Sequence, residues 1–524
     1  MITMTSRWTE KQRSWLTLLG LWAWLLVLAS TRPLALPDEG RYAEVGRWML
    51  MSGDWLAPRL NGMPFFHKPP LLHWLQASSF AVWGVHPWSA RLVPAFHAGL
   101  MLLALYLATR STQGEKVARH AVMILGSSLG FLIGGQYINH DMLVACWISI
   151  AIWAFAGALL QSGLPNVRLA LLGFAACALG LLSKGLIGLV LPGMVLLAWL
   201  IWTGQTRRLV HLPWVRGLLI FGVIGLPWFI EGQKHYPELF NYLIIGQHFS
   251  RYTGGTFNNQ WSWWFYPMAI ALLLFPWSLL LIGTAAPRKW LQIWRNERTA
   301  SHNHWNSLLW IWLLVITIFF SFPKSKIVGY IFPVLPPVAC LVAMTWHKWH
   351  EAGRVKSWWF TGLLLTSLGL SAGVNWAAGR HSLKHSSQDI ARVLQCNMTP
   401  SERVYVMGDY PYDLPFYAQL TQALVVLEDW DEARRSSGDN WRRELFEASD
   451  FDREAAKNLQ PISALAQPAD KTWLVTPSNV DALSLHAAWS MTFKGVAWTL
   501  WQFKPSTAKS PPAAQDERLP GCHD

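Results

Sequence analysis

Long apolar runs are the feature that most constrains how this chain of 524 residues can fold. A helix that crosses a bilayer needs about 20 mostly apolar residues, because the hydrocarbon layer is about 30 Å thick. Eleven segments approach that length and composition, and they are residues 15–36, 90–109, 120–138, 142–161, 168–183, 185–203, 215–231, 262–286, 305–322, 328–347 and 357–378. The sequence therefore predicts a mostly α-helical membrane protein with about 11 spans, in a range from 11 to 13.

The charge changes along the chain and marks a domain boundary. Residues 1–378 contain 28 Lys and Arg against 11 Asp and Glu, whereas residues 379–524 contain 15 against 19. In the second region short apolar strand patterns alternate with helical patterns, which is typical of a small α/β domain. The predicted strands are Arg403–Met407, Ala423–Leu427, Trp473–Thr476 and Trp498–Phe503, and the predicted helices include Gln388–Leu394, Trp441–Ala448 and Asn479–Ala487. We therefore predict a transmembrane domain over residues 1–378, a soluble α/β domain over 379–505 and a disordered tail over 506–524.

Basic residues in the short loops predict the orientation of the spans. Lys and Arg gather in the cytoplasmic loops of membrane proteins. With a cytoplasmic N-terminus, the inner loops hold 17 Lys and Arg, and the outer loops before the C-terminal region hold 11. An odd number of spans then places the C-terminal domain on the outer side. These loops explain the net charge of +13, so we expect the lipid bilayer as a partner and no nucleic acid.

Two long outer loops, residues 37–89 and 232–261, separate the predicted spans. In the first loop, apolar residues recur near helical spacing between Tyr42 and Trp55 and again after the Pro69-Pro70 pair. Helices with this pattern can lie in the plane of the membrane interface. An ordinary loop packed on the protein remains the alternative.

Ionisable residues at the outer ends of the spans are the candidate functional residues. Charges in or near the membrane cost free energy, and those that are present usually have a function. Each has a simpler explanation when taken alone. A lysine beside a span is often an anchor, Asp141 could cap a helix, and Asp38-Glu39 could form a solvated turn. Their gathering on one face favours a site, and the candidates are Asp38, Glu39, Arg41, Arg59, Lys68, Asp141, Lys184, His248, Arg251, Lys324, Lys326 and Tyr330.

The outer loops also carry short motifs in a fixed order. The first loop contains Pro-Asp-Glu-Gly-Arg-Tyr-Ala-Glu at 37–44, Ser-Gly-Asp-Trp-Leu at 52–56, Pro-Arg-Leu-Asn-Gly at 58–62 and Lys-Pro-Pro-Leu at 68–71. Later motifs are Ser-Lys-Gly at 183–185, Gly-Gln-His at 246–248 with Arg251, and residues 321–326 with Tyr330 and Pro333. Over roughly residues 15–350, this series resembles polyprenyl-phosphate-dependent membrane glycosyltransferases of the protein O-mannosyltransferase superfamily (family 39), including the bacterial branch that adds aminoarabinose to lipid A.

The resemblance implies a GT-C-type membrane fold and an enzyme of the bacterial inner membrane. Such an enzyme moves a hexose or pentose from undecaprenyl phosphate to lipid A, or to another glycan or protein, on the periplasmic side. Asp38 matches the family's essential acidic residue, and Asp141 resembles its second. Lys68 matches the lysine expected near the lipid phosphate, and Tyr330 lies in the pattern found near the sugar-lipid site.

The chemistry of this transfer gives the candidates their roles. Cations stabilise the departing phosphate, and we expect Lys68 and Lys326, helped by Lys184 or Arg59, to supply them. A carboxylate deprotonates the acceptor hydroxyl, and we expect Asp38 to do so, with Glu39 and Asp141 as further catalytic candidates. The remaining candidates for binding the lipid phosphate or sugar are Arg41, His248, Arg251 and Tyr330.

One position departs from the family pattern. The lipid A branch usually has Glu before the lysine of the Lys-Pro-Pro motif, and this chain has His67. The identities of the sugar and the acceptor are therefore left open. No cofactor is implied with certainty, and a divalent metal stays open, with His67 and His248 as weak candidate ligands.

A flippase or transporter for the same sugar-lipid is the alternative function. Transporters place their site near the middle of the membrane, often between internal repeats. The sequence has no internal repeat and no charge in the middle of a span, so the enzyme is favoured.

The cysteines allow one disulfide outside the predicted spans. Cys146, Cys177 and Cys340 fall within spans and are expected to be packing residues. Cys396 and Cys522 lie in the outer region and could pair in an oxidising compartment, or remain free.

Overall fold

The chain forms two compact units in the computed structural model, which describes residues 8–160, 163–250, 259–282, 304–466, 472–480 and 489–503. The first unit contains Met1–Arg32 and Phe66–Ala377, and the second contains Pro33–Phe65 and Ala378–Asp524. This division differs from the predicted domains, because residues 33–65 belong with the C-terminal region rather than with the spans. The predicted tail, 506–524, lies outside the described residues.

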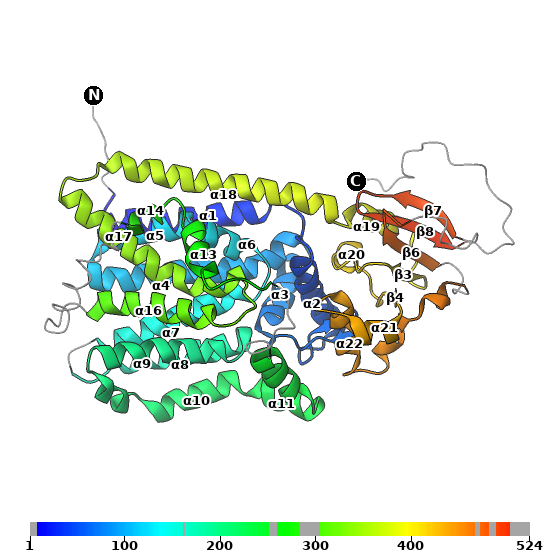
Figure 1. Ribbon diagram of the computed structural model, residues 1–524, viewed down its shortest axis with the longest axis horizontal. Helices are drawn as coiled ribbons and strands as arrows, with labels where there is room; N and C mark the ends of the chain where they lie inside the picture. The colour runs from blue at the N-terminus through cyan, green and yellow to red at the C-terminus, as the bar shows by residue number, and fades with distance from the viewer. Residues whose placement is uncertain are drawn as a thin grey trace. The chain divides into compact units, whose positions relative to one another are not determined.

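The first unit is helical, and most of its long helices run alongside one another (Figure 1). Its helices are α1 (Glu10–Ala29), α3 (Leu71–Trp83), α4 (Pro87–Gln113), α5 (Glu115–Ser127), α6 (Leu129–Gln136), α7 (Asp141–Leu159), α8 (Val167–Lys184), α9 (Ile187–Trp202), η1 (Thr206–His211), α10 (Trp214–Gly225), α11 (Pro227–His235), η2 (Asn241–Ser250), α13 (Phe265–Leu273), α14 (Leu279–Ile282), α16 (His304–Ser321), η3 (Val328–Val334), α17 (Leu335–Glu351) and α18 (Ser357–His385). Helix α18 continues past the end of the first unit, and its last residues belong to the second.

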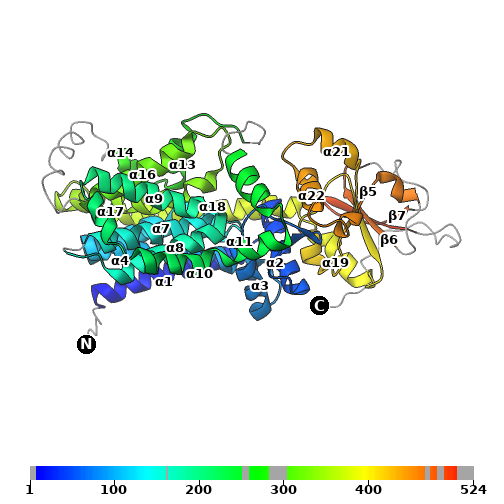
Figure 2. The same ribbon diagram turned by 90° about the horizontal axis from the view of Figure 1, so that it is seen from below.

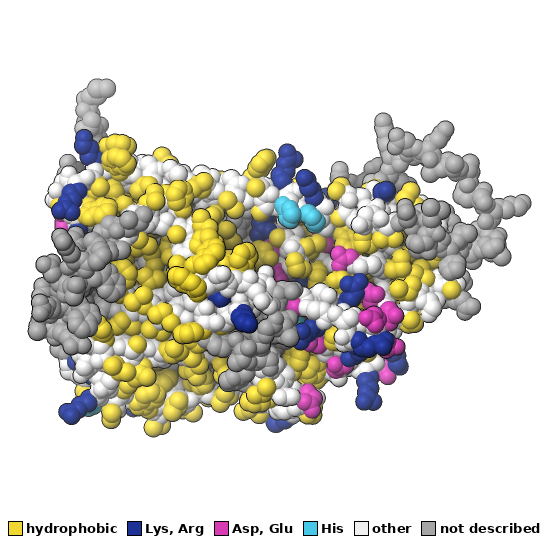
Figure 3. Space-filling model, viewed as in Figure 1, with side chains coloured by type: hydrophobic (Ala, Val, Ile, Leu, Met, Phe, Trp, Pro, Cys, Tyr) yellow, Lys and Arg dark blue, Asp and Glu magenta, His cyan; other side chains and the backbone are white. Residues whose placement is uncertain are grey.

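Among the described residues, six helices are long and apolar enough to cross a membrane, or eight if each of two bent helix pairs is one span. The bent pairs are α5 with α6, at 62°, and α10 with α11, at 42°. Helix α9, at 16 residues, is shorter than a typical span. The prediction of about 11 spans is therefore not confirmed. Hydrophobic side chains cover much of the visible surface of these helices (Figure 3), as expected for a lipid-facing bundle.

Glycines and tryptophans set the packing of this bundle. A Cβ on Gly180 of α8 would lie 3.0 Å from the Cα of Gly188 in α9, so the two backbones approach each other directly. Small residues at helix contacts are typical of membrane proteins, because they maximise van der Waals contact. Helix α10 packs along α8 (Figure 2). In the core, the Trp153 ring lies 4.7 Å from those of Trp305 and Trp312.

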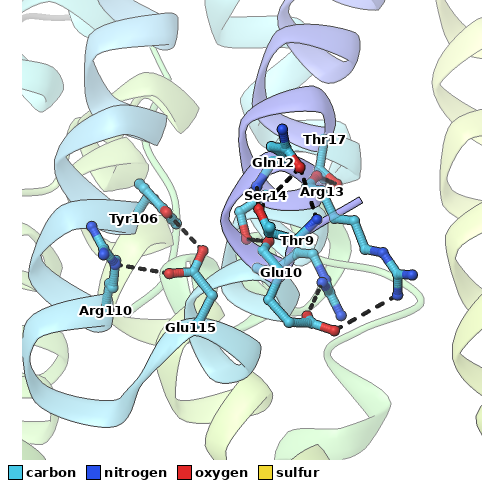
Figure 4. Close-up of polar contacts among 10 residues, drawn as sticks. Thr9, Glu10, Gln12, Arg13, Ser14, Thr17, Tyr106, Arg110 and Glu115 are labelled. Carbon is cyan, nitrogen blue, oxygen red and sulfur yellow. Dashed lines mark hydrogen bonds and ion pairs between the residues drawn. The ribbon is translucent and has the colours of Figure 1, made fainter. Parts of the chain in front are cut away.

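One end of the bundle carries the paired charges drawn in Figure 4. Glu10, in the first turn of α1, pairs with Arg13 and Arg119, and the side chain of Thr9 caps the same helix. Nearby, Glu115 accepts a hydrogen bond from Tyr106 Oη at 2.7 Å and pairs with Arg110 at 2.8 Å. These arginines belong to loops that the sequence predicts to be cytoplasmic.

The opposite end of α1 is fixed by a buried arginine. Arg91 Nη1 in α4 donates to the carbonyl oxygens of Ala29 and Arg32, at 2.9 and 2.7 Å. A cation here satisfies the last carbonyls of the helix and complements its dipole. Arg32 Nη2 in turn donates to the carbonyl of Gln136, at the end of α6. The ends of α1, α4 and α6 are thereby joined.

The second unit is an α/β domain built on a six-stranded sheet. Its elements are α2 (Asp38–Ser52), β1 (Arg59–Leu60), β2 (Met63–Pro64), α19 (Gln388–Asn397), β3 (Arg403–Met407), α20 (Leu414–Ala418), β4 (Val425–Leu427), α21 (Trp430–Ser436), α22 (Trp441–Ser449), η4 (Ala455–Asn458), β5 (Leu459–Gln460), η5 (Ile462–Ala466), β6 (Thr472–Pro477), β7 (Trp489–Lys494) and β8 (Trp498–Phe503). The sheet order is β5-β4-β3-β6-β8-β7. Strands β3 to β6 are parallel, and β8 and β7 join the edge in antiparallel register.

The predicted α/β character of this region is confirmed. Strands β3, β4, β6 and β8 and helices α19 and α22 coincide with predicted segments, because their buried residues follow clear strand or helix patterns. Most of the helix predicted at Asn479–Ala487 lies outside the described residues. Strand β7 was not predicted, since three of its six residues are exposed and it lies at the sheet edge. Cys396 of this domain is disulfide-bonded, and Cys522 lies outside the described residues.

Residues 33–65 join this domain through specific polar contacts. Asn61 Nδ2 donates to the carbonyl oxygen of Leu424 at 3.0 Å, and Asn61 Oδ1 accepts from the Leu424 amide at 2.8 Å. In α2, Arg47 is buried, pairs with Glu44 at 2.7 Å and donates to the carbonyl of Leu420. A buried arginine with both a carboxylate and a carbonyl partner has its hydrogen-bonding capacity largely satisfied. The first outer loop is therefore an integral part of the second unit up to residue 65.

Candidate functional site

The two units divide the predicted site residues between them. Asp38, Glu39, Arg41 and Arg59 lie in the second unit. Lys68, Asp141, Lys184, Lys324, Lys326 and Tyr330 lie in the first. Arg251 and the side chain of His248 lie outside the described residues, so their predicted roles stay predictions.

Asp38 begins helix α2. A carboxylate in the first turn is stabilised by the helix dipole, and Asp38 Oδ1 also accepts a charge-assisted hydrogen bond from Arg41 Nη2. The Asp38 side chain is 35% exposed, which leaves part of the carboxylate accessible. The predicted role of Asp38 as the base stays a prediction.

The neighbouring carboxylate, Glu39, has a different environment. Its side chain is fully buried, and Oε2 accepts a hydrogen bond from the Ala35 amide at 2.8 Å. This contact closes the turn that leads into α2. The geometry is that of a residue that fixes the backbone, while its predicted catalytic role stays a prediction.

Arg41 lies between two carboxylates. Its Nη1 pairs with Glu444 Oε1 of α22, and its guanidinium lies 4.8 Å from the Tyr42 ring and 5.7 Å from the Tyr412 ring. Burial disfavours the charge, but Glu444, Tyr42 and Asp38 together outweigh burial and raise the pKa of Arg41. Sequence analysis missed Glu444, because nothing in its local pattern distinguishes it from the other acidic residues of this region.

Arg59 in β1 forms ion pairs and hydrogen bonds with residues of the second unit. Its Nε pairs with Asp54 at 3.1 Å, and its Nη1 pairs with Asp452 at 2.9 Å and donates to the Gly62 carbonyl at 2.8 Å. Arg59 thus holds the β1-β2 hairpin against the segment after α22. Its predicted part in binding a phosphate stays a prediction.

In the first unit, three predicted residues from distant parts of the chain meet. Asp141 at the start of α7 pairs with Lys184 at the end of α8, and the Lys184 ammonium lies 4.3 Å from the centre of the Tyr330 ring in η3. The Asp141 and Lys184 side chains are only 7% and 9% exposed. Asn139 Nδ2 donates to Asp141 Oδ2 at 2.9 Å. The structure therefore brings Asp141, Lys184 and Tyr330 together in one buried polar group.

Gly329 makes this arrangement sterically feasible. It precedes Tyr330 in η3, and a Cβ at this position would collide with the Asp141 carboxylate. Glycine at this position lets η3 pack closely against the start of α7. The sequence analysis did not single it out.

Two histidines that the sequence analysis missed lie beside this group. His140 Nδ1 contacts the Ser183 carbonyl at 2.8 Å, and its ring lies 5.4 Å from that of His73 in α3. Burial lowers the pKa of His140 well below its ordinary value, and the charges of His73, Lys68 and Lys184 lower it further. This influence places Lys68 within electrostatic reach of the same group, with its Nζ donating to the His67 carbonyl at 2.8 Å.

Lys326, just before η3, forms hydrogen bonds with the backbone of two neighbouring segments. Its Nζ donates to the Trp261 carbonyl at 2.9 Å and to the Pro323 carbonyl at 2.5 Å, and its amide donates to the Asn259 carbonyl at 2.9 Å. Burial lowers the pKa of the Lys326 ammonium. Its contacts link the turn before η3 to the segment before α13. Phosphate binding by Lys326 stays a prediction.

A metal centre finds no support among the residues that the structure describes. In that part of the chain, no three His, Cys, Asp or Glu side chains form a group that could hold a metal ion. The ring of His67 lies 5.9 Å from that of Tyr242. The side chain of His248, the other candidate ligand, is outside the described residues.

Comparison with known proteins gives a family and several relatives. Residues 21–243 match the family described as dolichyl-phosphate-mannose-protein mannosyltransferase. An undecaprenyl phosphate-alpha-4-amino-4-deoxy-L-arabinose arabinosyl transferase of Pseudomonas fluorescens is 31% identical over 379 residues, which are 71% of this chain and 63% of that protein. The transferase of the same name from Pseudomonas aeruginosa is 30% identical over 369 residues, 70% of this chain and 65% of that protein. The chain thus matches somewhat less than two thirds of the length of these relatives.

Solved structures confirm the fold class. ArnT from Cupriavidus metallidurans, bound to undecaprenyl phosphate, matches 95% of this chain and 99% of its own, with a TM-score of 0.77 at 21% identity. The oligosaccharyltransferase of Archaeoglobus fulgidus matches 89% of this chain and 69% of its own, with a TM-score of 0.53 at 14% identity. The chain is therefore a multi-pass membrane protein of GT-C type with a small C-terminal sheet domain, as expected from the sequence.

Proposed function

We propose that the protein is a membrane glycosyltransferase with a polyprenyl-phosphate sugar donor, because residues 21–243 match the family described as dolichyl-phosphate-mannose-protein mannosyltransferase. The donor is undecaprenyl phosphate carrying a pentose or hexose, and the acceptor is lipid A or another envelope glycan or protein. The names of the Pseudomonas relatives support 4-amino-4-deoxy-L-arabinose as the first sugar to test. His67, where the lipid A branch usually has Glu, keeps a different sugar open.

The observation that carries this proposal is the gathering of Asp141, Lys184 and Tyr330 at one end of the bundle. The chain direction of α7 and α8 places this group opposite the end that carries the Arg110 and Arg119 pairs. A transporter would place its site near the middle of the spans. Ionisable groups at one end instead suit an enzyme that acts on a lipid headgroup at one membrane surface.

We assign the reaction as a single displacement with inversion. The acceptor hydroxyl oxygen forms a bond to the anomeric carbon while its proton passes to the Asp38 carboxylate. The bond from the anomeric carbon to the phosphate oxygen breaks, and undecaprenyl phosphate leaves with the electron pair. Lys68, helped by Lys184 and Lys326, stabilises the negative charge that develops on the phosphate. Tyr330, held beside Lys184, orients the donor headgroup.

We propose the bacterial inner membrane as the location, with a cytoplasmic N-terminus and a periplasmic second unit. The paired arginines in Figure 4 then lie at the cytoplasmic end, as the rule for basic loops requires. Alkaline phosphatase fused after Phe503 should be active, and the same enzyme fused after Gln113 should be inactive. Activity in the reverse pattern would overturn this orientation.

The function is tested with the purified protein in detergent, labelled undecaprenyl-phosphate sugars and candidate acceptors, including lipid A. An enzyme transfers the label to an acceptor although no sealed membrane is present. Transport of the labelled lipid across sealed vesicles, with no transfer in detergent, would contradict the enzyme and support a flippase.

A further inference from the structure

Helix α18 carries no ionisable side chain over most of its length. No Asp, Glu, Lys, Arg or His lies between Lys356 and Arg380. Trp358 and Trp376 lie near the two ends of this stretch, and they are 63% and 67% exposed. At about 1.5 Å per residue the two are about 27 Å apart along the helix, close to the bilayer's hydrocarbon thickness of about 30 Å. Because exposed tryptophans favour the two membrane interfaces, this spacing fits a helix that crosses the bilayer.

Buried polar side chains fix the rotation of α18 about its own axis. Ser367 and Ser371 donate hydrogen bonds to the carbonyl oxygen of Ser127 in α5, at 2.7 and 3.3 Å. One turn further along, Asn375 Nδ2 donates to Thr31 Oγ1 at 2.9 Å. Hydrogen bonds of this kind join neighbouring helices within a membrane. The opposite face of α18 is therefore held away from these partners.

That opposite face carries a stripe of exposed apolar side chains. The stripe consists of Trp358, Leu365, Trp376 and Leu383, each of them at least half exposed. The spacing between successive members is close to two or three whole turns, so all four lie on one side of the helix. Arg380 and Lys384 follow Trp376 by about one and two turns, which places both cations beside the stripe.

Basic side chains gather on the last turns of α18. Arg380, His381 and Lys384 are all exposed and belong to the second unit, and Figure 3 shows Lys, Arg and His side chains beside one another where α18 ends. Among the residues that the structure describes, Lys384 forms no ion pair. The next acidic residue along the chain is Asp389, whose two oxygens accept hydrogen bonds from backbone amides. The positive charge of this basic cluster is therefore open to an external anion.

The rise of the helix gives the depth of the basic cluster. Arg380 and Lys384 lie about 6 and 12 Å beyond Trp376 along the helix. The headgroup layer adds about 5–7 Å to the hydrocarbon on each side, and long basic side chains can extend several Å along a helix. Side chains in a helix tilt toward its N-terminus, which for α18 is the direction of the uncharged stretch. Both cations can therefore reach the phosphate groups of lipids beside α18.

The end of the helix that carries the basic cluster is firmly held. Ser386 Oγ and Ser387 Oγ donate to the buried carboxylate of Asp413, at 2.8 and 2.7 Å. Trp498 Nε1 donates to the His385 carbonyl oxygen at 3.3 Å. These contacts fix the backbone while the basic side chains remain at the surface.

From this placement we propose that Arg380, His381 and Lys384 bind the phosphate groups of anionic phospholipids at the membrane surface. Guanidinium, ammonium and imidazole N–H groups all donate hydrogen bonds to phosphate oxygens, and Lys and Arg beside a bilayer attract anionic lipids. Trp376 and Leu383 contact the upper part of the lipid chains. Lipid binding at this site requires neither a sugar donor nor an acceptor, so it is independent of the proposed transfer reaction.

The proposed orientation makes this cluster more informative. Helix α18 begins at the end of the bundle proposed to be cytoplasmic, so its basic end is on the periplasmic side. Lys and Arg are sparse in short periplasmic segments, because the basic residues that orient spans lie on the cytoplasmic side. Arg380 and Lys384 therefore do not serve to orient α18, and binding of anionic lipid gives them a role.

The test uses purified full-length protein in phosphatidylcholine nanodiscs that contain a small share of photoreactive lipid. This lipid is either phosphatidylglycerol or phosphatidylcholine, with the same reactive group on the acyl chain next to the glycerol. After irradiation, mass spectrometry measures the fraction of residues 370–385 that carries lipid. We expect phosphatidylglycerol to label this segment about 10-fold more than phosphatidylcholine, since each Lys or Arg near the surface favours an anionic lipid about fivefold.

Matched variants show whether the preference is local. In Arg380→Gln/Lys384→Gln the preference for phosphatidylglycerol should fall by about 10-fold. The control, Arg435→Gln/Lys457→Gln, removes the same two kinds of charge from 73% and 71% exposed positions of the same unit. It should keep the wild-type preference. If the double variant at α18 does not fold, Lys384→Gln alone should lower the preference by about 3- to 5-fold.

Three results would overturn the proposal. One is a wild-type preference in folded Arg380→Gln/Lys384→Gln, or in Lys384→Gln where only that variant folds. Another is an equal loss in the control, which would show an effect of net charge alone. The third is loss of labelling when excess inorganic phosphate is added at constant ionic strength, which would indicate a site for soluble phosphate instead of lipid. Because no sugar donor is present, failure of the proposed transfer reaction would leave each of these results unchanged.

Discussion

Asp38 and Asp141 are both carboxylates that begin a helix and pair with a cation, but they differ in how exposed they are and in what else their cation contacts. In the first unit, Asp141 is 7% exposed, pairs with Lys184, which lies over Tyr330, and accepts a hydrogen bond from Asn139. In the second unit, Asp38 is 35% exposed and shares Arg41 with Glu444. We therefore propose that the buried pair of Asp141 and Lys184 orients Tyr330, and that the more exposed Asp38 carries out the proton transfer.

The largest effect is expected for Asp38→Asn. Removing a general base typically lowers the rate by about 10²–10⁴-fold, and the Asn side chain can still accept a hydrogen bond from Arg41. The thermal unfolding midpoint in detergent should therefore stay close to that of wild type while kcat falls. Product formation from labelled sugar-lipid, measured beside the unfolding curve, checks both parts. If Asp38→Asn lost stability as much as activity, Asp38 would have a structural role like that of Asp141, and the proposed difference between the two carboxylates would be wrong.

Lys184→Met should produce the largest loss of stability. Removing one partner of a buried ion pair leaves an uncompensated charge and typically costs about 3–5 kcal/mol. Asp141→Asn with Lys184→Met should lose less than the sum of the two single variants. Lys457→Met is the control, because its pair with Glu454 is 71% and 82% exposed and such pairs contribute at most about 1 kcal/mol. Additive losses in a double-mutant cycle would show that Asp141 and Lys184 are not coupled.

Gly329→Ala tests the packing around Asp141, the other member of the Asp141–Lys184 pair. The added methyl group would collide with the Asp141 carboxylate, and overpacking of this kind costs about 1–3 kcal/mol. We expect reduced stability and reduced transfer. Gly362→Ala in α18 meets open space and should be neutral or slightly stabilising. Thermal unfolding of both variants decides the matter, and equal behaviour would contradict the packing of η3 against α7.

The smallest effect is a pH dependence in the second unit. Asp413 is fully buried, and burial raises its pKa despite hydrogen bonds from Ser386 and Ser387. As the pH rises, the unfolded carboxyl ionises before the folded one, so the folded state loses relative stability between the unfolded pKa and the raised folded pKa. Wild type should therefore lose more stability than Asp413→Asn over this window. The unfolding midpoint measured from pH 4 upward tests this sign, with Asp409→Asn as an exposed control.

The sequence predicted well those elements whose boundaries are set by neighbouring residues. The spans predicted at 142–161 and 168–183 became Asp141–Leu159 and Val167–Lys184, because each apolar run has a charged residue at one end, Asp141 at the start of α7 and Lys184 at the end of α8. The strands of the C-terminal domain were found in the same way. The search for ionisable and motif residues at the outer ends of the spans also identified Asp141, Lys184 and Tyr330, which the structure then brings together.

Features that depend on distant contacts could not be predicted from the sequence. The assignment of residues 33–65 to the second unit rests on contacts such as that between Asn61 and Leu424, which are 363 residues apart. Glu444 lies in a polar helix with no motif, and His73 and His140 look like ordinary residues beside apolar runs. The bends between α5 and α6 and between α10 and α11 arise in segments that read as continuous spans.

The central claim is that the protein attaches a sugar to an envelope acceptor and needs Asp38 to do so. Mass spectrometry of envelope lipids and glycans from cells without the protein, with wild type and with Asp38→Asn tests it most directly. We predict a mass increment of one glycosyl residue on lipid A or another acceptor with wild type only. Identical spectra with and without the protein, or the same increment with Asp38→Asn, would contradict the claim.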